Sequence, residues 1–135
     1  MQENKAKSTF GSDGEPTFKP TISMGDIYLL DWTPGRGSEQ TGMRPAVIVQ
    51  NNAFNINPRF PNTVVVTVSK HGREVPTHVP VPQSAENGLW EPVSYVKCEQ
   101  LFTIDKMRLG RKVGKLTPEQ LAAVSKALKR VLSLV

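Results

Sequence analysis

The chain has 135 residues and a formal net charge of +5, from 17 Lys and Arg against 12 Asp and Glu. This length favours one domain of ordinary size, and a single cysteine, Cys98, excludes a disulfide framework. Positive charge suits a polyanionic partner, although part of it lies near the N-terminus. Cys98 stands in a strand-like stretch, so we expect a buried apolar residue and no nucleophile.

Residues 1–22 are rich in Lys, Glu, Ser, Thr, Gly and Pro and have no hydrophobic periodicity. This composition predicts a flexible N-terminal extension, followed by a folded domain at residues 23–135. The start lacks the apolar core of a signal peptide. The longest apolar runs, AVIV and VVV, are far shorter than the about 18 residues of a membrane helix. We therefore expect a cytoplasmic protein that does not bind membranes.

The first two strands are expected on either side of a long loop. Residues 27–32 form a mostly apolar run with aromatic side chains, and residues 44–50 alternate between two faces. The loop between them, TPGRGSEQTGM, holds three glycines and a proline. It is longer than a hairpin turn needs, and long ordered loops are often functional. Polar residues 51–62 follow and are expected to hold one short helical turn.

The remaining strands are short and regularly spaced. Alternation in the third places Thr67 and Ser69 on one face, and the prolines of the fourth suggest a sheet edge, because proline cannot donate to the ladder. These strands are expected at residues 63–70, 77–82, around 93–102 and 111–116.

The C-terminal stretch LTPEQLAAVSKALKRVLSLV predicts a helix. Thr117 is its N-cap, Pro118 its first position, and Gln120 completes a capping box. Short strands followed by one helix, without βαβ units, predict a mainly β fold, a small antiparallel barrel with a C-terminal α-helix. An apolar stripe with spacings of three and four either packs on the barrel or contacts a second copy, or both. Its members are Leu121, Val124, Leu128, Val131 and Val135.

Neither a nucleotide loop nor a metal site is supported by the sequence. GRGSEQTG lacks the Lys and Ser or Thr of a P-loop, and Gln40 stands where a dinucleotide fingerprint needs its last glycine. The two histidines, His71 and His78, have no second ligand at a metal-binding spacing. We expect an exposed turn residue and a half-exposed strand residue, and we predict no metal and no cofactor.

The stretch GDIYLLDWTPGRGSEQTGMRPAVIVQNNAFN resembles the opening signature of the MazF/PemK family of ribonuclease toxins from bacterial toxin–antitoxin modules. NTVVVTVSK, THVPVP, a Gly-Leu pair, EQLFTIDKMRLGRKVGKL and the final helix follow in family order, from about Gly25 to the C-terminus. The resemblance implies an SH3-like barrel of the PemK/CcdB type, usually a homodimer. It implies cleavage of single-stranded RNA without a metal, a MazE-like antitoxin whose acidic tail occupies the RNA groove, and DNA binding through the antitoxin complex.

The resemblance assigns two catalytic residues, Arg44 and Ser69. Metal-free cleavage uses the substrate's own 2′-hydroxyl, so a fixed cation must meet the extra negative charge at phosphorus, and a guanidinium binds phosphate oxygens bidentately. Pro45 also holds Arg44 in an extended backbone. Ser69 is expected to orient the reacting groups and stabilise charge rather than act as a base. From composition alone, a surface arginine and a half-exposed hydroxyl would be the alternative interpretations.

Further residues are predicted to contact RNA. The glycine-rich loop would bind the RNA through its backbone amides and Arg36. Glu39 either acts as a base, caps the loop or contacts RNA. Phe102 stands where many relatives have arginine, so it either stacks on a base or is buried. The predicted RNA contacts are Arg36, Gly37, Ser38, Glu39, Gln40, Thr67, Lys70, Gln100 and Phe102.

Two other functions stay open at this point. Gyrase-poisoning toxins share the implied fold and bind a protein target without catalysis. They use an apolar, aromatic C-terminal tip, and the tip KRVLSLV has no aromatic residue. A non-catalytic RNA-binding barrel is the third possibility. The presence of Arg44 and Ser69 favours the ribonuclease.

Overall fold

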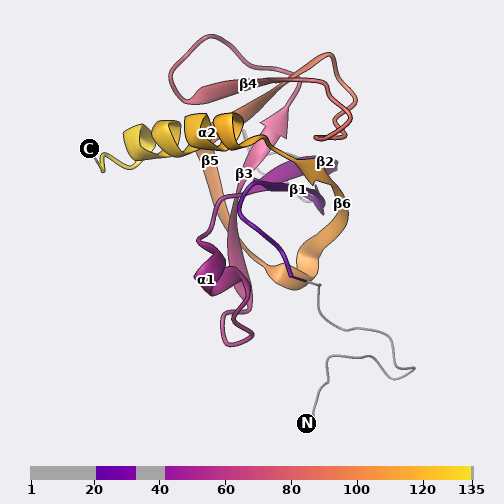
Figure 1. Cartoon of the computed structure of the whole chain (residues 1–135), viewed down its shortest axis with the longest axis vertical. Helices are drawn as coiled ribbons and strands as arrows, with labels where there is room; N and C mark the ends of the chain where they lie inside the picture. Colours follow the sequence, from indigo (N-terminus) through magenta and orange to yellow (C-terminus); the bar gives the residue numbers. More distant parts are fainter. Residues whose placement is uncertain (1–20, 33–41, 135) are drawn as a thin grey trace.

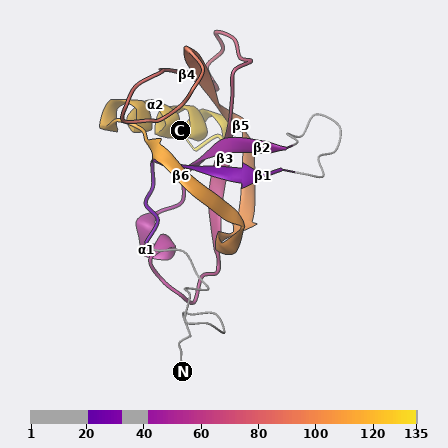
Figure 2. The ribbon, with the colours of Figure 1, turned by 90° about the vertical axis from the view of Figure 1, so that its right-hand side faces the viewer.

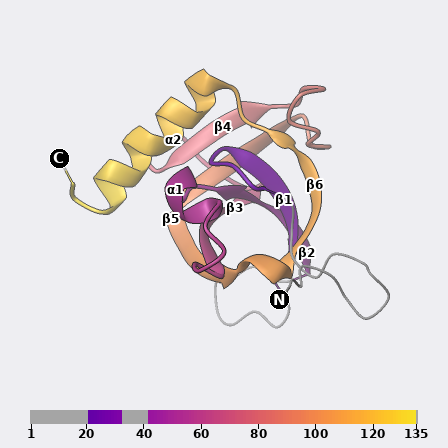
Figure 3. The same ribbon diagram turned by 60° about the horizontal axis from the view of Figure 1, so that its bottom comes forward.

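The computed structural model describes residues 21–32 and 42–134. Its antiparallel strands form one six-stranded sheet that curls into a small barrel (Figures 1 and 3). The order in the sheet is β4-β5-β3-β2-β1-β6, so β4 and β6 are the edges and do not close the barrel by pairing. The elements are β1 (Asp26–Asp31), β2 (Met43–Ile48), α1 (Asn52–Asn55), β3 (Asn62–Ser69), β4 (His78–Pro82), β5 (Val93–Asp105), the 3₁₀ turn η1 (Lys106–Arg108), β6 (Leu109–Lys115) and α2 (Pro118–Val131).

Both faces of the central strands are buried, which explains why their sequences are continuous apolar runs. Along β2, Val47 packs into a cluster that α2 covers, whereas Ala46 and Ile48 pack into a second cluster on the opposite face. Along β3, Val66 and Val65 divide between the same two clusters. A slip of one residue would exchange the two faces of a strand, so this packing fixes the register of β2 against β3.

Strand β5 contains a bulge opposite β3. Val66 pairs with Leu101, but the next residue of β3, Thr67, pairs with Lys97, so residues 98–100 are extra on the β5 side. The Thr67 hydroxyl donates a hydrogen bond of 2.6 Å across this bulge to Oε1 of Gln100. Bulges bend a strand and re-aim its side chains. Residues 93–97 of β5 pair with β4, and β5 also pairs with β3 on both sides of the bulge.

Helix α2 lies across β4 and β5 (Figure 1). Its predicted capping box is confirmed: Oγ1 of Thr117 accepts from the Gln120 amide at 3.1 Å, and the Thr117 amide donates to Oε1 of Gln120 at 2.9 Å. The predicted packing of its apolar stripe on the barrel is also confirmed, whereas Val135 lies outside the described residues. The helix side chains in this contact are Val124, Ala127, Leu128 and Val131.

The predicted order of five or six short strands and a final helix is confirmed, with six strands in the described residues, and α1 is the expected helical turn, capped by the Asn51 side chain. Strand β5 extends beyond its predicted end because Asp105 still pairs with Asn62 of β3. Ile22, which the sequence pattern assigns to the N-terminal extension, is buried in the second cluster. Residues 1–20 of that extension lie outside the described residues.

The structure contains no helix, within residues 21–32 and 42–134, that is long and apolar enough to cross a membrane. Figure 2 shows α1 and α2 on the left of the view, whereas the end of β1 and the start of β2 lie on the right. Those ends lead into the segment of residues 33–41, which is not described.

Replacing Thr117 by Ala should lower the free energy of unfolding by about 1 kcal/mol, because the Gln120 amide loses its acceptor. For a domain of this size, the melting temperature should fall by about 4 °C in a thermal unfolding experiment followed by circular dichroism. Thr117→Ser keeps the acceptor and should melt close to the parent. Identical melting of Thr117→Ala and the parent would show that the cap adds nothing to stability.

Candidate functional site

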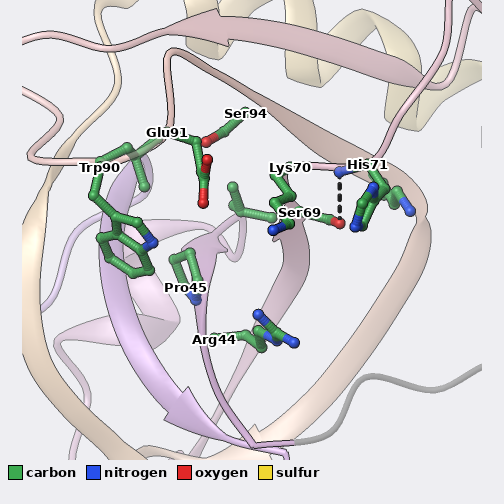
Figure 4. A pocket seen from close by; sticks show the side chains of 11 residues that line it. Arg44, Pro45, Ser69, Lys70, His71, Trp90, Glu91 and Ser94 are labelled. Atoms are coloured by element: carbon green, nitrogen blue, oxygen red, sulfur yellow. Dashed lines mark hydrogen bonds between the residues drawn. The ribbon is translucent and has the colours of Figure 1, made fainter.

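A pocket opens where the end of β3 meets the start of β2 (Figure 4). Its cavity of about 230 Å³ is walled by β2, β3, β5 and the loop of residues 83–92 that joins β4 to β5. The two residues predicted to be catalytic, Arg44 and Ser69, both line it. The polar side chains of the lining are Arg44, Ser69, Lys70, His71, Glu91, Ser94 and Lys97.

Arg44 lies at the start of β2, opposite Leu30 of β1 in the antiparallel register. The residue is exposed, whereas Pro45 directly after it is buried. Figure 4 shows its guanidinium at one end of the pocket. Proline holds the preceding residue in an extended conformation. The positive charge is therefore attached to a rigid part of the sheet, and its position varies only through the side chain.

Ser69 is the last residue of β3 and is half-buried. Its Oγ accepts a hydrogen bond of 3.0 Å from the backbone amide of His71, which closes a tight turn at the strand end (Figure 4). A hydroxyl has one donor and two acceptor positions. This turn uses one acceptor position and leaves the hydroxyl proton able to donate into the pocket.

The charge of the pocket favours an anion. Arg44, Lys70 and Lys97 bring positive charge to its lining, whereas Glu91 is the one carboxylate among the lining residues that the structure describes. These side chains come from different strands and loops, so the fold brings together this local excess of positive charge. A concave site with this balance suits a phosphodiester or an acidic peptide.

The structure places the predicted RNA contacts differently from one another. Lys70 lines the pocket. Thr67 has no exposed surface and cannot touch RNA. It can affect RNA binding only by holding the side chain of Gln100 across the bulge. The ring of Phe102 packs edge-on against Trp32, with centroids 4.9 Å apart, which favours the buried role over stacking on a base. The loop contacts lie outside the described residues: Arg36, Gly37, Ser38, Glu39 and Gln40.

A second, adjacent pocket holds a hydrogen-bonded pair that the sequence pattern did not indicate. The His78 imidazole, of which 8% is exposed, contacts Oε2 of Glu99 through Nε2 at 2.8 Å. Nδ1 of His78 accepts from the Arg73 amide at 3.2 Å, which places the proton on Nε2. Gln100 lines this pocket too. His78 does lie in a strand as expected, but its partner is distant in sequence, and no local motif could reveal it.

The Glu99 carboxylate is stabilised in its charged form. Partial burial raises its pKa, but the hydrogen bonds from His78, from its own backbone amide and from Thr77 together outweigh burial and lower the pKa below its ordinary value. The pair therefore fastens the bulge of β5 to β4.

Cys98 is buried, as the sequence predicts. Burial, with a smaller contribution from the charge of Glu99, raises the pKa of its thiol to about 12. The thiolate needed for nucleophilic attack is therefore scarce at neutral pH. Among the described residues, no three His, Cys, Asp or Glu side chains gather in a metal-binding group.

The sequence profile of one family, described as "PemK-like, MazF-like toxin of type II toxin-antitoxin system", matches residues 23–132. The chain belongs to this family. Its relatives include endoribonuclease EndoA of Bacillus subtilis (strain 168), 37% identical over 117 residues, which are 84% of this chain and 97% of that protein. Endoribonuclease MazF of Staphylococcus epidermidis is 36% identical over 110 residues, 79% of this chain and 88% of that protein.

The fold agrees with solved members of the PemK/MazF family. An endoribonuclease in complex with its cognate antitoxin, from mycobacterial species, superposes with a TM-score of 0.67 at 27% identity. The match covers 84% of this chain and 97% of that one. The predicted mainly β fold with a C-terminal helix and the resemblance to this family are both confirmed.

The stability of the bulge should depend on pH through Glu99. Its lowered pKa means that the pair stabilises the fold at neutral pH and that this contribution disappears as the pH falls through the folded-state pKa. At neutral pH, Glu99→Gln should therefore have a lower free energy of unfolding than the parent. The difference should be less than about 1 kcal/mol, because the carboxylate is well exposed, and it should vanish in acid.

Thermal unfolding of both proteins across the acidic range provides the measurement. Glu74→Gln removes an exposed carboxylate from the neighbouring loop and serves as the control. A gap between parent and Glu99→Gln that stays constant with pH would contradict a role for the charged form.

Proposed function

We propose that the protein is an endoribonuclease toxin that acts as a homodimer in the cytoplasm, cuts single-stranded RNA at specific sequences without a metal, and is neutralised by a cognate antitoxin. The observation that carries this proposal is the meeting of Arg44 and Ser69 in one cationic pocket. Two relatives at 37% and 36% identity are named endoribonucleases, which supports the activity. A related endoribonuclease in complex with its antitoxin supports the partner.

The proposed reaction is a transesterification within the RNA. The 2′-oxygen attacks the adjacent phosphorus, and its proton passes to a base or to solvent. The bond between phosphorus and the 5′-oxygen breaks, and that oxygen takes up a proton. The products are a 2′,3′-cyclic phosphate and a 5′-hydroxyl, and the step needs no oxidant, reductant or further reactant.

Arg44 is proposed to hold two non-bridging oxygens of the phosphate and to stabilise the charge that develops on them in the transition state. Ser69 is proposed to donate its hydroxyl proton to the same group, with its orientation set by the hydrogen bond from His71. Lys70 and Lys97 add positive potential around the bound strand. The same charge balance suits the acidic tail of an antitoxin, which would inhibit by occupying the pocket.

Arg44→Ala should abolish cutting, because a fixed charge contact to the transition state is typically worth about 3–4 kcal/mol, or about 10²–10³ in rate. Arg44→Lys should recover little, since an ammonium lacks the bidentate fork. Cleavage of a long RNA by purified variants, with circular dichroism to verify folding, gives the measurement. A folded Arg44→Ala that cuts near the parent rate would place the active site elsewhere.

Ser69 provides the graded comparison for that experiment. Ser69→Thr retains the hydroxyl and suits a strand, so it should remain active. Ser69→Ala loses the donor and should be slower than the parent but faster than Arg44→Ala. The cleavage rate should fall from the parent to Ser69→Ala and fall further to Arg44→Ala. This order would distinguish an orienting hydroxyl from an essential cation.

Cleavage should persist in excess chelator, because the proposed step draws its nucleophile from the RNA and its charge stabilisation from Arg44. Affinity for RNA should fall as salt rises, since phosphate contacts release counterions. Activity that returns only when a divalent ion is added would contradict the mechanism. Specific RNA binding without any cut product would favour a non-catalytic barrel, and absence of both would favour a protein-targeting toxin.

A further inference from the structure

The loop of residues 83–92 presents an exposed aromatic side chain to the cationic pocket. Trp90 is 52% exposed, although it follows Leu89, which is buried in the cluster beneath α2. Both residues line the pocket that contains Arg44 and Ser69. In Figure 4 the indole lies toward Pro45, with Arg44 beyond it and Ser69 on the opposite wall.

The loop that carries Trp90 is held by buried hydrogen bonds. Asn87 is completely buried, its amide donates to the Pro82 carbonyl at 2.9 Å, and its Oδ1 accepts from the Leu89 amide at 2.9 Å. The Lys115 amide of β6 donates to the Glu86 carbonyl at 3.1 Å and fastens the loop to the sheet edge. Beyond Trp90, the Pro92 carbonyl accepts from the Gln83 amide at 3.0 Å, so Trp90 projects from a backbone that is fixed on both sides.

This arrangement has the physical properties of a stacking platform. Half of the large apolar Trp90 side chain faces water, so the exposed part adds little to the stability of the fold. A ligand that covers the indole would gain stacking and burial, with little loss of backbone freedom because the loop is already ordered. The cations nearby indicate that this ligand carries phosphate.

We propose that Trp90 stacks on the base of a nucleotide next to the phosphodiester that Arg44 holds, and so contributes to the choice of cleavage site. This inference rests on the proposed function of the pocket. Trp32, the other tryptophan, is 8% exposed and packs against Phe102, so it cannot serve in this way. The aromatic contact to RNA that the sequence suggested for Phe102 is thereby supplied by a different residue.

Tryptophan fluorescence can detect the stacked base directly. The probe is a 2′-O-methyl RNA oligonucleotide of mixed sequence, which lacks the attacking hydroxyl and cannot be cut. Titration with this probe should quench the fluorescence of the parent and of Trp32→Phe in a saturable manner. The same titration should leave the emission of Trp90→Phe, which comes only from Trp32, essentially unchanged.

Affinity and cutting provide the second measurement. Trp90→Ala should bind the probe about tenfold more weakly, whereas Trp90→Phe keeps a ring and should stay within about threefold of the parent. Trp90→Ala should also cut a mixed-sequence RNA with altered preference among sites. Met107→Ala removes an equally exposed apolar side chain from another pocket and should change neither property.

Sedimentation equilibrium of the variants separates stacking from a structural role. Trp90→Ala should keep the oligomeric state of the parent, and dissociation would overturn the proposal by making Trp90 a subunit contact. If the parent cuts RNA and Trp90→Ala binds and cuts RNA as the parent does, the stacking role is overturned and the proposed function is not. A parent that neither binds nor cuts RNA overturns the proposed function, and the stacking role with it.

Discussion

The register of β2 against β3 is the constraint on which the site depends. Ala46 pairs with Thr67, and the same register continued two residues outward along each strand brings Arg44 opposite Ser69. Because both faces of these strands are buried, a slip by one residue would place apolar side chains in the wrong cluster and separate the two groups. The hydrophobic core thus fixes the geometry of a polar pocket that lies outside it.

Hydrogen bonds hold the strands and the loop next to the pocket. Thr67 is buried and holds Gln100 across the bulge of β5, while the contact between His78 and Glu99 fastens that bulge to β4. The buried Asn87 side chain fixes the loop that carries Trp90 by hydrogen bonds to the backbone of Pro82 and Leu89. A preorganised site loses little entropy when it binds and needs little rearrangement as charge develops, and both effects favour the transition state.

Much of the fold was predictable from sequence because it depends on local patterns. Apolar runs indicated the central strands, and the capping box around Thr117 indicated where α2 begins. Arg44 and Ser69 followed from family resemblance. The bulge, the His78–Glu99 pair and the exposure of Trp90 were not predictable, because each depends on contacts between segments distant in sequence. Phe102 was left with two possible roles because its neighbour Trp32 lies about half of the chain before it in sequence.

The two tryptophans suggest how the chain accommodates Phe102 at a position where the family resemblance leads us to expect arginine. A guanidinium at that position would add a phosphate contact, whereas the Phe102 ring packs on Trp32 and extends the second core cluster. In the proposed function, an arginine there would attract RNA electrostatically, and that attraction would weaken with salt. Stacking on Trp90 would replace part of it with an interaction that depends much less on salt and more on the identity of the base. In the proposed function, the exchange would therefore shift RNA recognition from charge towards base contact.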